Sequence, residues 1–328
     1  MTAVYVLVAL VLAGLLLPAV AGPRVLRSAA PVLMRMPRVA VGLLSSAVVF
    51  WTLAALSVGP LLAWVVTGPD LLPADAAAVC SRCLAAADPF GLDRIDTAVP
   101  VALLLVIPVA ASVAHAVRVA LEARRRRSTT LRTAALYRHR GVPARIHGHA
   151  VRLVDDAHPF ALALPRRHGG IMVSTAAVEL LSDEELGAVL AHEAAHLRQR
   201  HHAVSALVST LTTGLRWVPL FAAVEDALGH YLEIAADDAA RRTAGTTALA
   251  GALLTLGRYG RHRDHSGEEL AGALHALGPD RIRHLVQPAS GSRGVAAAVA
   301  TAFCLTSLAL LAAAVHVPYA MAVVTGCY

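Results

Sequence analysis

Four long apolar runs limit what this chain can fold into more than any other feature of its sequence. They cover about residues 4–21, 39–66, 98–121 and 295–324, and each is long enough to cross a bilayer as a helix of about 20 residues. The composition agrees, because 57% of the residues are hydrophobic and only 16% are charged, against about 25% charged in ordinary soluble domains. The sequence therefore predicts an α-helical membrane protein with about four transmembrane helices.

The charges between these runs predict how the helices cross the membrane. The loop after the first run carries four arginines and no acid, and an arginine cluster at 124–127 follows the third run. Segment 67–97 instead carries five aspartates against two arginines. By the positive-inside rule, the arginine-rich segments are cytoplasmic and 67–97 is an extracellular loop. The predicted organisation is a membrane domain at 1–127, a cytoplasmic domain at 128–293, and a fourth transmembrane helix with a short extracellular tail at 294–328.

The predicted cytoplasmic domain combines short strands with a clearly marked helix. Short β-like runs occur at Ala150–Val154, Phe160–Leu164 and Ile171–Ser174, and Pro and Gly turn signals separate them. A helix then begins after Ser182, because Ser182 and Glu185 form an S-x-x-E capping box ahead of an apolar stripe. This order of elements predicts an α+β domain.

The predicted helix carries the HExxH pattern as His192-Glu193-Ala194-Ala195-His196. Two histidines four residues apart project from one helix face, so both imidazoles can reach one metal ion. The glutamate beside the first histidine can then take a proton from the attacking water. A chance match somewhere in the chain has a probability of roughly a few per cent. We therefore predict a zinc site with His192 and His196 as ligands and Glu193 as the general base.

Catalytic zinc usually has a third protein ligand, and His202 is one candidate for it. His202 lies ten residues after His192, but Gln199 and its arginine neighbours are good helix formers that favour a continuous helix. Such a helix carries His202 about 15 Å along its axis from His192. We therefore expect His201 and His202 to be a surface pair.

Glu233 is the better candidate for the third ligand, and Asp237 follows it one helical turn later on the same face. Glu233 can bind zinc, while Asp237 can accept a hydrogen bond that orients a ligand imidazole. The intervening segment 203–224 is apolar, and a full membrane crossing there would separate Glu233 from His192. Two crossings would return the chain to the same side, but they would need about 40 residues, more than this segment contains. The Glu233 assignment therefore predicts a core, re-entrant or interfacial helix at 203–224.

The sequence HEAAH followed by EIAAD resembles the gluzincin pattern of HtpX-like integral-membrane proteases, and it is closer still to the peptidase part of the BlaR/MecR antirepressor family. The resemblance covers about 145–285 and implies a gluzincin zinc metallopeptidase fold at 128–293. It also implies a cytoplasmic active site and regulated cleavage of a protein such as a transcriptional repressor. No penicillin-binding domain follows the last apolar run, so direct sensing of β-lactams is not expected. Further segments that resemble the family are Pro159–Pro165, Ile171–Thr175, Leu181–Leu186 and Arg281–Leu285.

Several weaker signals add smaller expectations. His230 and Tyr231 are candidate donors to the tetrahedral oxyanion of peptide hydrolysis. Phe160–Leu164 predicts either an edge strand that binds extended substrate or an ordinary core strand. Cys80 and Cys83 favour a local disulfide in an oxidising exterior, ahead of a redox sensor.

The arginine cluster at 124–127 favours attraction to anionic lipid headgroups over nucleic-acid binding, because it lies just beyond a predicted membrane helix. The expected partners are therefore a protein substrate and the lipid bilayer, and direct nucleic-acid binding is not expected. Every basic side chain is arginine, and the absence of lysine excludes a Walker-type phosphate loop and a Schiff-base lysine.

Two other functions are compatible with parts of the sequence. The first is a non-catalytic membrane signalling or scaffold protein with a degenerate protease domain, although every expected catalytic position is filled. The second is a small transporter or channel, which predicts charged groups inside the spans. The apolar runs offer His115 and His316 for that role, each near the end of its run.

Overall fold

The computed structural model describes residues 2–67, 101–260 and 294–325. The predicted loop with Cys80 and Cys83, and the segment Arg281–Leu285, lie outside these residues. The helices are α1 (Thr2–Leu33), α2 (Pro37–Thr67), α4 (Val101–Arg140), α5 (Thr175–Leu180), α6 (Asp183–Arg198), α7 (His201–Leu211), α8 (Pro219–Ala244), α9 (Thr246–Gly260), α11 (Val295–Thr325) and the 3₁₀ helix η2 (Arg166–His168). The strands are β1 (Gly141–Ile146), β2 (His149–Val154), β3 (Ala161–Ala163) and β4 (Ile171–Ser174).

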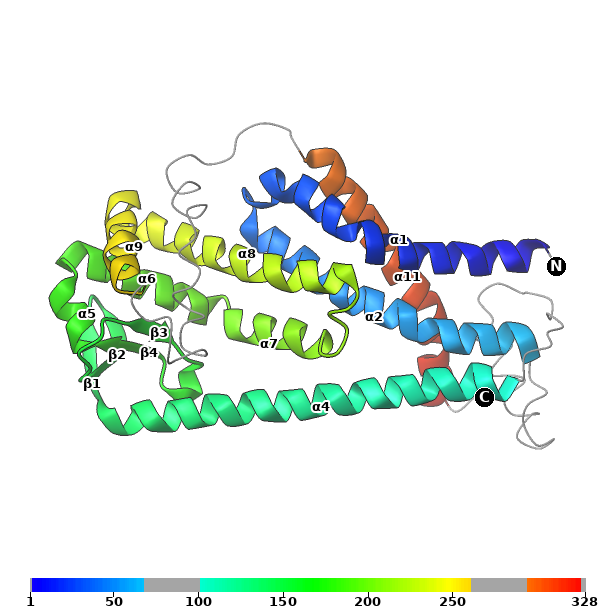
Figure 1. Ribbon diagram of the computed structural model, residues 1–328, viewed down its shortest axis with the longest axis horizontal. Coiled ribbons are helices and arrows are strands. Elements are labelled where there is room, and N and C mark those ends of the chain that lie inside the picture. The colour runs from blue at the N-terminus through cyan, green and yellow to red at the C-terminus, as the bar shows by residue number, and fades with distance from the viewer. Residues whose placement is uncertain (1, 68–100, 261–293, 326–328) are drawn as a thin grey trace.

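The molecule is elongated, with the small sheet and α5, α6 and α9 at one end (Figure 1). The N-terminal parts of α1 and α4 and the C-terminal part of α2 lie at the opposite end. In the part of the chain that the structure describes, helices α1, α2, α4 and α11 coincide with the four predicted apolar runs, with α4 beginning at Val101. Within the described residues, Pro37–Leu56 is long and apolar enough to cross a membrane, and Val295–Leu310 is a shorter apolar segment. Four membrane spans therefore remain a prediction.

Helix α4 is longer than the apolar run at its start. It continues without interruption to Arg140. It therefore runs through 127–128, the predicted boundary between the membrane domain and the cytoplasmic domain. The arginine cluster at 124–127 therefore lies on a helix that joins the apolar run to the sheet (Figure 1).

The sheet has the strand order β1-β2-β4-β3. Strand β1 pairs antiparallel with β2, β2 runs parallel to β4, and β3 pairs antiparallel with β4 at the edge. Three predicted strands are thus confirmed, whereas β1 was not predicted. Its sequence contains Pro143 and an exposed Arg145 and has no apolar alternation, which suits an edge strand but gives little signal.

Helix α6 packs its apolar stripe on the sheet. The predicted capping box is confirmed, because Ser182 Oγ accepts from the Glu185 backbone N–H and the Glu185 side chain accepts from the Ser182 N–H. Leu186, Val189 and Leu190 are buried in one cluster with residues of β2, β3, β4 and α9. This packing fixes the rotation of α6, so that its HExxH face turns away from the sheet core.

The expectation of a continuous helix beyond Gln199 is wrong. Helix α6 ends at Arg198, and Arg200 takes a left-handed conformation with φ of 54° before α7 begins at His201. Left-handed backbone is uncommon for residues other than glycine, so a run of good helix formers does not predict it. The chain therefore changes direction immediately after the HExxH motif.

Segment 203–224 does not form one long helix. Helix α7 ends at Leu211, and α8 begins with Pro219 at its first turn, where proline is well tolerated. The Glu225 carboxylate accepts hydrogen bonds from Thr212 and Arg216 and ties the turn to α8. The two helices lie side by side as a hairpin (Figure 1), which meets the condition that the Glu233 assignment placed on this segment.

Helix α8 lies at the centre of the molecule. Phe221, Val224 and Leu228 are buried in one cluster with residues of α1 and α2. The ring of Phe221 meets Trp51 of α2 edge-on at a centroid distance of 5.0 Å. Helix α8 also packs against α6, so one helix connects the long apolar helices to the HExxH motif.

Candidate metal centre

The paired helices α6 and α8 bring His192, His196 and Glu233 together. One potential ligand atom from each residue lies within 4.8 Å of the other two. The histidines are one turn apart on α6, and Glu233 reaches them from α8. All three side chains are largely buried, with exposed fractions of 11%, 12% and 15%. The structure thus places the three predicted ligands around one point.

The distances between these atoms fit a tetrahedral metal site. The two Nε2 atoms of His192 and His196 lie 3.0 Å apart. The Glu233 oxygens lie 3.4 Å from His192 Nε2 and 3.5 Å from His196 Nε2. Ligand atoms around tetrahedral zinc lie about 3.3 Å apart when each bond is 2.0–2.1 Å. Two nitrogens and a carboxylate, with a fourth position left open, are also the usual donors of catalytic zinc.

Asp237 lies behind His192, where it can orient the imidazole. Its Oδ1 is 2.9 Å from His192 Nδ1, and its side chain is only 2% exposed. Burial acts to lower the pKa of His192, but contacts with Asp237 and Glu233 outweigh it and raise this pKa to about 10. The two carboxylates therefore attract a positive charge at this point, which a bound metal cation would supply.

His201 lies behind the second histidine, although we expected it on the surface. That expectation is wrong, because His201 is only 4% exposed. Its Nδ1 is 2.9 Å from His196 Nδ1, and its Nε2 is 3.4 Å from Oε1 of Gln199. If His196 binds the ion through Nε2, its Nδ1–H donates to His201, and His201 then donates to Gln199. The same Gln199 oxygen accepts from Arg38 Nε at 3.2 Å, so the hydrogen bonds extend to the start of α2.

Both histidines of this pair are uncharged at neutral pH. Burial lowers the pKa of His196 to about 3 and that of His201 to about 4. Neutral imidazole is the form that binds metal and accepts a hydrogen bond. No sequence pattern pointed to His201, because on a continuous α6 its side chain would point away from His196.

We expect the His201→Phe variant to bind zinc about 10–100-fold more weakly, since ligand histidines depend on such partners for orientation. Phenylalanine keeps the ring volume but removes both nitrogens. The matched control is His202→Phe, because His202 is exposed and bonds to the Ala163 backbone. Competition with a zinc indicator dye measures both affinities, and equal affinities in the two folded variants would remove His201 from the site.

The remaining predicted residues occupy different surroundings. Glu193 follows His192 on α6 and is partly buried. Tyr231 lies in the apolar core between α8, α1 and α2, and burial raises its pKa to about 12. Its surroundings favour packing over oxyanion binding. The ring of His230, which is less buried, lies edge-on to that of Tyr231, and its oxyanion role remains a prediction.

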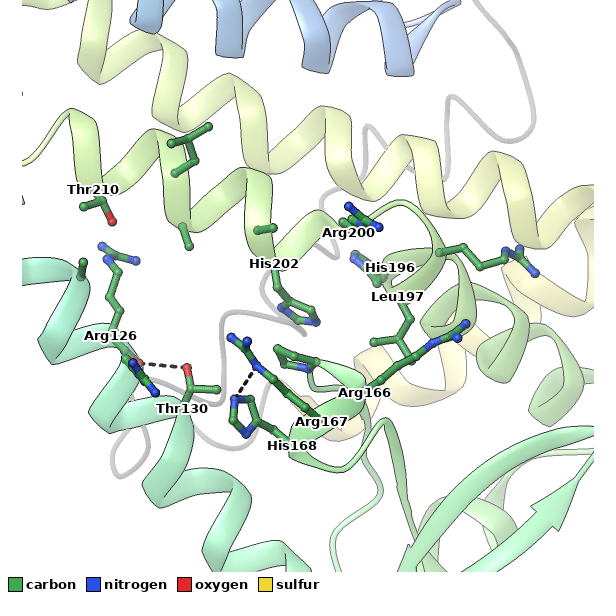
Figure 2. Close-up of a pocket in the computed structure, with 17 residues that line it drawn as sticks. Arg126, Thr130, Arg166, Arg167, His168, His196, Leu197, Arg200, His202 and Thr210 are labelled. Atoms are coloured by element: carbon green, nitrogen blue, oxygen red, sulfur yellow. Dashed lines mark hydrogen bonds between the residues drawn. The ribbon is translucent and has the colours of Figure 1, made fainter.

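A cleft of about 880 Å³ opens beside the metal cluster. His196 lines it, and its walls come from α4, η2, the end of α6 and α7 (Figure 2). Figure 2 shows His202 extending from α7 toward η2. Although part of the His202 side chain reaches solvent, the cleft walls desolvate its ring and lower its pKa, and the hydrogen bond to the Ala163 backbone partly offsets this. The cleft therefore extends from His196 of the metal cluster to Pro165, in the segment that follows the edge strand β3.

Comparison with known proteins gives one family match. The sequence model described as Peptidase family M48 matches residues 120–311, more than half of the chain. Relatives named Protease HtpX homolog match shorter segments. The chain is 35% identical over 74 residues to the one from Ralstonia nicotianae, and 33% over 70 residues to the one from Thermodesulfovibrio yellowstonii. These segments span 22% and 21% of this chain and 26% and 25% of the relatives.

The matched part of the chain thus corresponds to about a quarter of the length of these curated relatives. No solved structure matches the chain significantly. The matches agree with the HtpX-like part of the sequence resemblance, whereas the closer likeness to BlaR/MecR peptidases is not confirmed.

Proposed function

Because the chain belongs to peptidase family M48, we propose that it is a membrane-bound zinc endopeptidase. His192, His196 and Glu233 hold the zinc ion, Asp237 orients His192, and Glu193 is the general base. The observation that carries this proposal is the convergence of the three ligand atoms within 4.8 Å, with Glu193 adjacent to a ligand on the same helix.

The mechanism is hydrolysis of a peptide bond. The zinc ion, when bound, supplies Lewis acidity that activates water and polarises the scissile carbonyl. The Glu193 carboxylate takes a proton from the attacking water as the oxygen bonds to the carbonyl carbon. It then delivers that proton to the amide nitrogen as the C–N bond breaks. Asp237 and His201 act indirectly, by holding the two imidazoles in the orientation that binds the metal.

The membrane part of the proposal rests on the long apolar helices. Pro37–Leu56 is long and apolar enough to span a bilayer, and α1, α4 and α11 are proposed as further spans. The arginines after the third apolar run support a protease domain on the cytoplasmic side of the plasma membrane. Trp217, at the turn of the α7–α8 hairpin, is 78% exposed, as suits a side chain at the level of lipid headgroups. This supports an interfacial position for the hairpin.

The proposed substrate is a cytoplasmic or membrane-proximal protein. The resemblance to antirepressor peptidases makes a transcriptional repressor in a signalling pathway the first candidate to test. The second candidate function is a non-catalytic membrane scaffold, which requires a degenerate site. The intact ligand geometry and the glutamate at position 193 favour catalysis.

Metal removal tests this function directly. We expect the full-length protein, purified in detergent, to contain about one zinc ion per chain and to cleave an unfolded protein substrate. Treatment with a chelator should abolish cleavage, and added zinc should restore it. Elemental analysis and gel electrophoresis of the substrate provide the two measurements. A folded protein with no zinc and no cleavage would favour the scaffold.

A further inference from the structure

The cleft beside the metal cluster is unusually rich in arginine. Six of the 17 residues that line it are arginines, whereas the whole chain has 29 basic residues among 328. No Asp or Glu is among the lining residues. The arginines come from separate parts of the sequence, on α4, on η2 and around the end of α6: Arg126, Arg127, Arg166, Arg167, Arg198 and Arg200.

Most of this positive charge is not neutralised within the part of the chain that the structure describes. Arg126 forms a salt bridge with Glu122 at 2.7 Å, and Arg167 donates to His168 at 3.0 Å. No acid among the described residues pairs with Arg127, Arg166, Arg198 or Arg200. Like charges so close together repel one another and disfavour the folded state. Binding of an anionic group would relieve this repulsion.

We propose that this cleft binds acidic side chains of the substrate next to the scissile bond, so that the protein selects peptides with Asp or Glu in that segment. The inference rests on the proposed protease function, because His196 ties the cleft to the metal cluster. Arginine suits this task, since its planar guanidinium binds a carboxylate through two parallel hydrogen bonds. Apolar residues such as Leu197 and Leu207 also line the cleft and would pack against the rest of the segment.

A peptide fits the cleft better than a lipid headgroup does. Headgroup attraction would require only the α4 arginines beyond the apolar run, whereas here η2 and the end of α6 supply four more. Arg166 and Arg167 lie on η2, which follows β3, and Arg198 and Arg200 lie at and just beyond the end of α6, which carries the HExxH motif. The volume of about 880 Å³ is within the range of about 300–1,000 Å³ that encloses a drug-sized ligand. Four of the six arginines therefore come from elements other than the helix that continues the apolar run.

The test compares peptides that differ only in charge. Three fluorescent peptides share one central sequence and carry Asp and Glu, their uncharged counterparts Asn and Gln, or Arg in the flanks. Binding is measured by anisotropy with zinc-loaded, full-length Glu193→Gln protein in phosphatidylcholine nanodiscs, and cleavage is measured with the wild type. We expect the acidic peptide to bind at least about 10-fold more tightly than the uncharged one at low salt. This preference should decline as added salt screens the charges.

Charge reversal provides the decisive variant. Arg127→Glu combined with Arg166→Glu places an acid on each wall, and we expect it to prefer the basic peptide. The control, Arg132→Glu with Arg145→Glu, changes the net charge equally at exposed arginines outside the cleft and should keep the acidic preference. A reversed preference cannot result from misfolding, so it reports the cleft itself.

The outcomes separate this inference from the protease function. Wild-type cleavage that ignores flanking charge would overturn the acidic preference and leave the protease intact. Charge-dependent binding without any cleavage would support the cleft and remove the protease function. If reversal changes only the association with phosphatidylserine nanodiscs, the cleft is a headgroup site and the proposal is wrong.

Discussion

The Glu193→Gln variant is expected to lose about 10²–10⁴-fold in kcat while it keeps its zinc, because general acid–base catalysis contributes factors of that size. Glutamine has nearly the same shape as glutamate but cannot take a proton from water at neutral pH. The three ligand atoms do not include Glu193, so the metal content should not change. A fluorogenic peptide gives the rate, and elemental analysis gives the zinc per chain.

The matched control is Glu184→Gln, which removes the same charge from the first turn of the same helix at an exposed position. Its activity should remain close to that of the wild type. Zinc lost together with activity in Glu193→Gln would mean that Glu193 supports the site structurally. Activity retained in Glu193→Gln would mean that another group accepts the proton.

The local half of this site could be predicted from the sequence. His192 and His196 lie one turn apart on a helix whose start is marked by the Ser182 capping box, and such relations depend only on helix geometry. Glu233 and Asp237 have the same spacing on α8. That Asp237 faces His192 follows once the two helices are placed side by side. These patterns are readable because each is contained within one helix.

The placement of His201 and of the cleft depends on the turn at Arg200 between α6 and α7, which has no recognisable sequence signal. Arg200 adopts left-handed backbone without being Gly or Asn, so the end of α6 has no glycine signal at that position. That turn brings the buried His201 against His196. Helix α7 then runs alongside α4. The arginine cleft is hidden for a related reason, since its walls come from distant segments that only the tertiary fold brings together. Propensity describes segments one at a time and cannot reveal such contacts.

The Glu233→Gln variant is expected to bind zinc about 100-fold more weakly or worse, since even partners behind the ligands contribute about 10–100-fold. The neutral amide is a poorer donor to zinc and removes one of the two carboxylates that attract a cation. We expect zinc dissociation during dialysis against a chelator to be much faster in this variant than in the wild type. Cleavage activity should fall in proportion to the zinc that remains bound.

Asp226→Asn is the matched control, because it removes an acid from the same helix two turns earlier, where the side chain is 74% exposed. Unchanged zinc in Glu233→Gln would exclude Glu233 as a ligand and return attention to His202. In the structure His202 makes a hydrogen bond to the Ala163 backbone and is not among the three residues whose ligand atoms converge, so it could bind the metal only after its side chain reorients. A combined Glu233→Gln/His202→Phe variant separates the two cases, since only a ligand role for His202 predicts that the second substitution removes the remaining zinc.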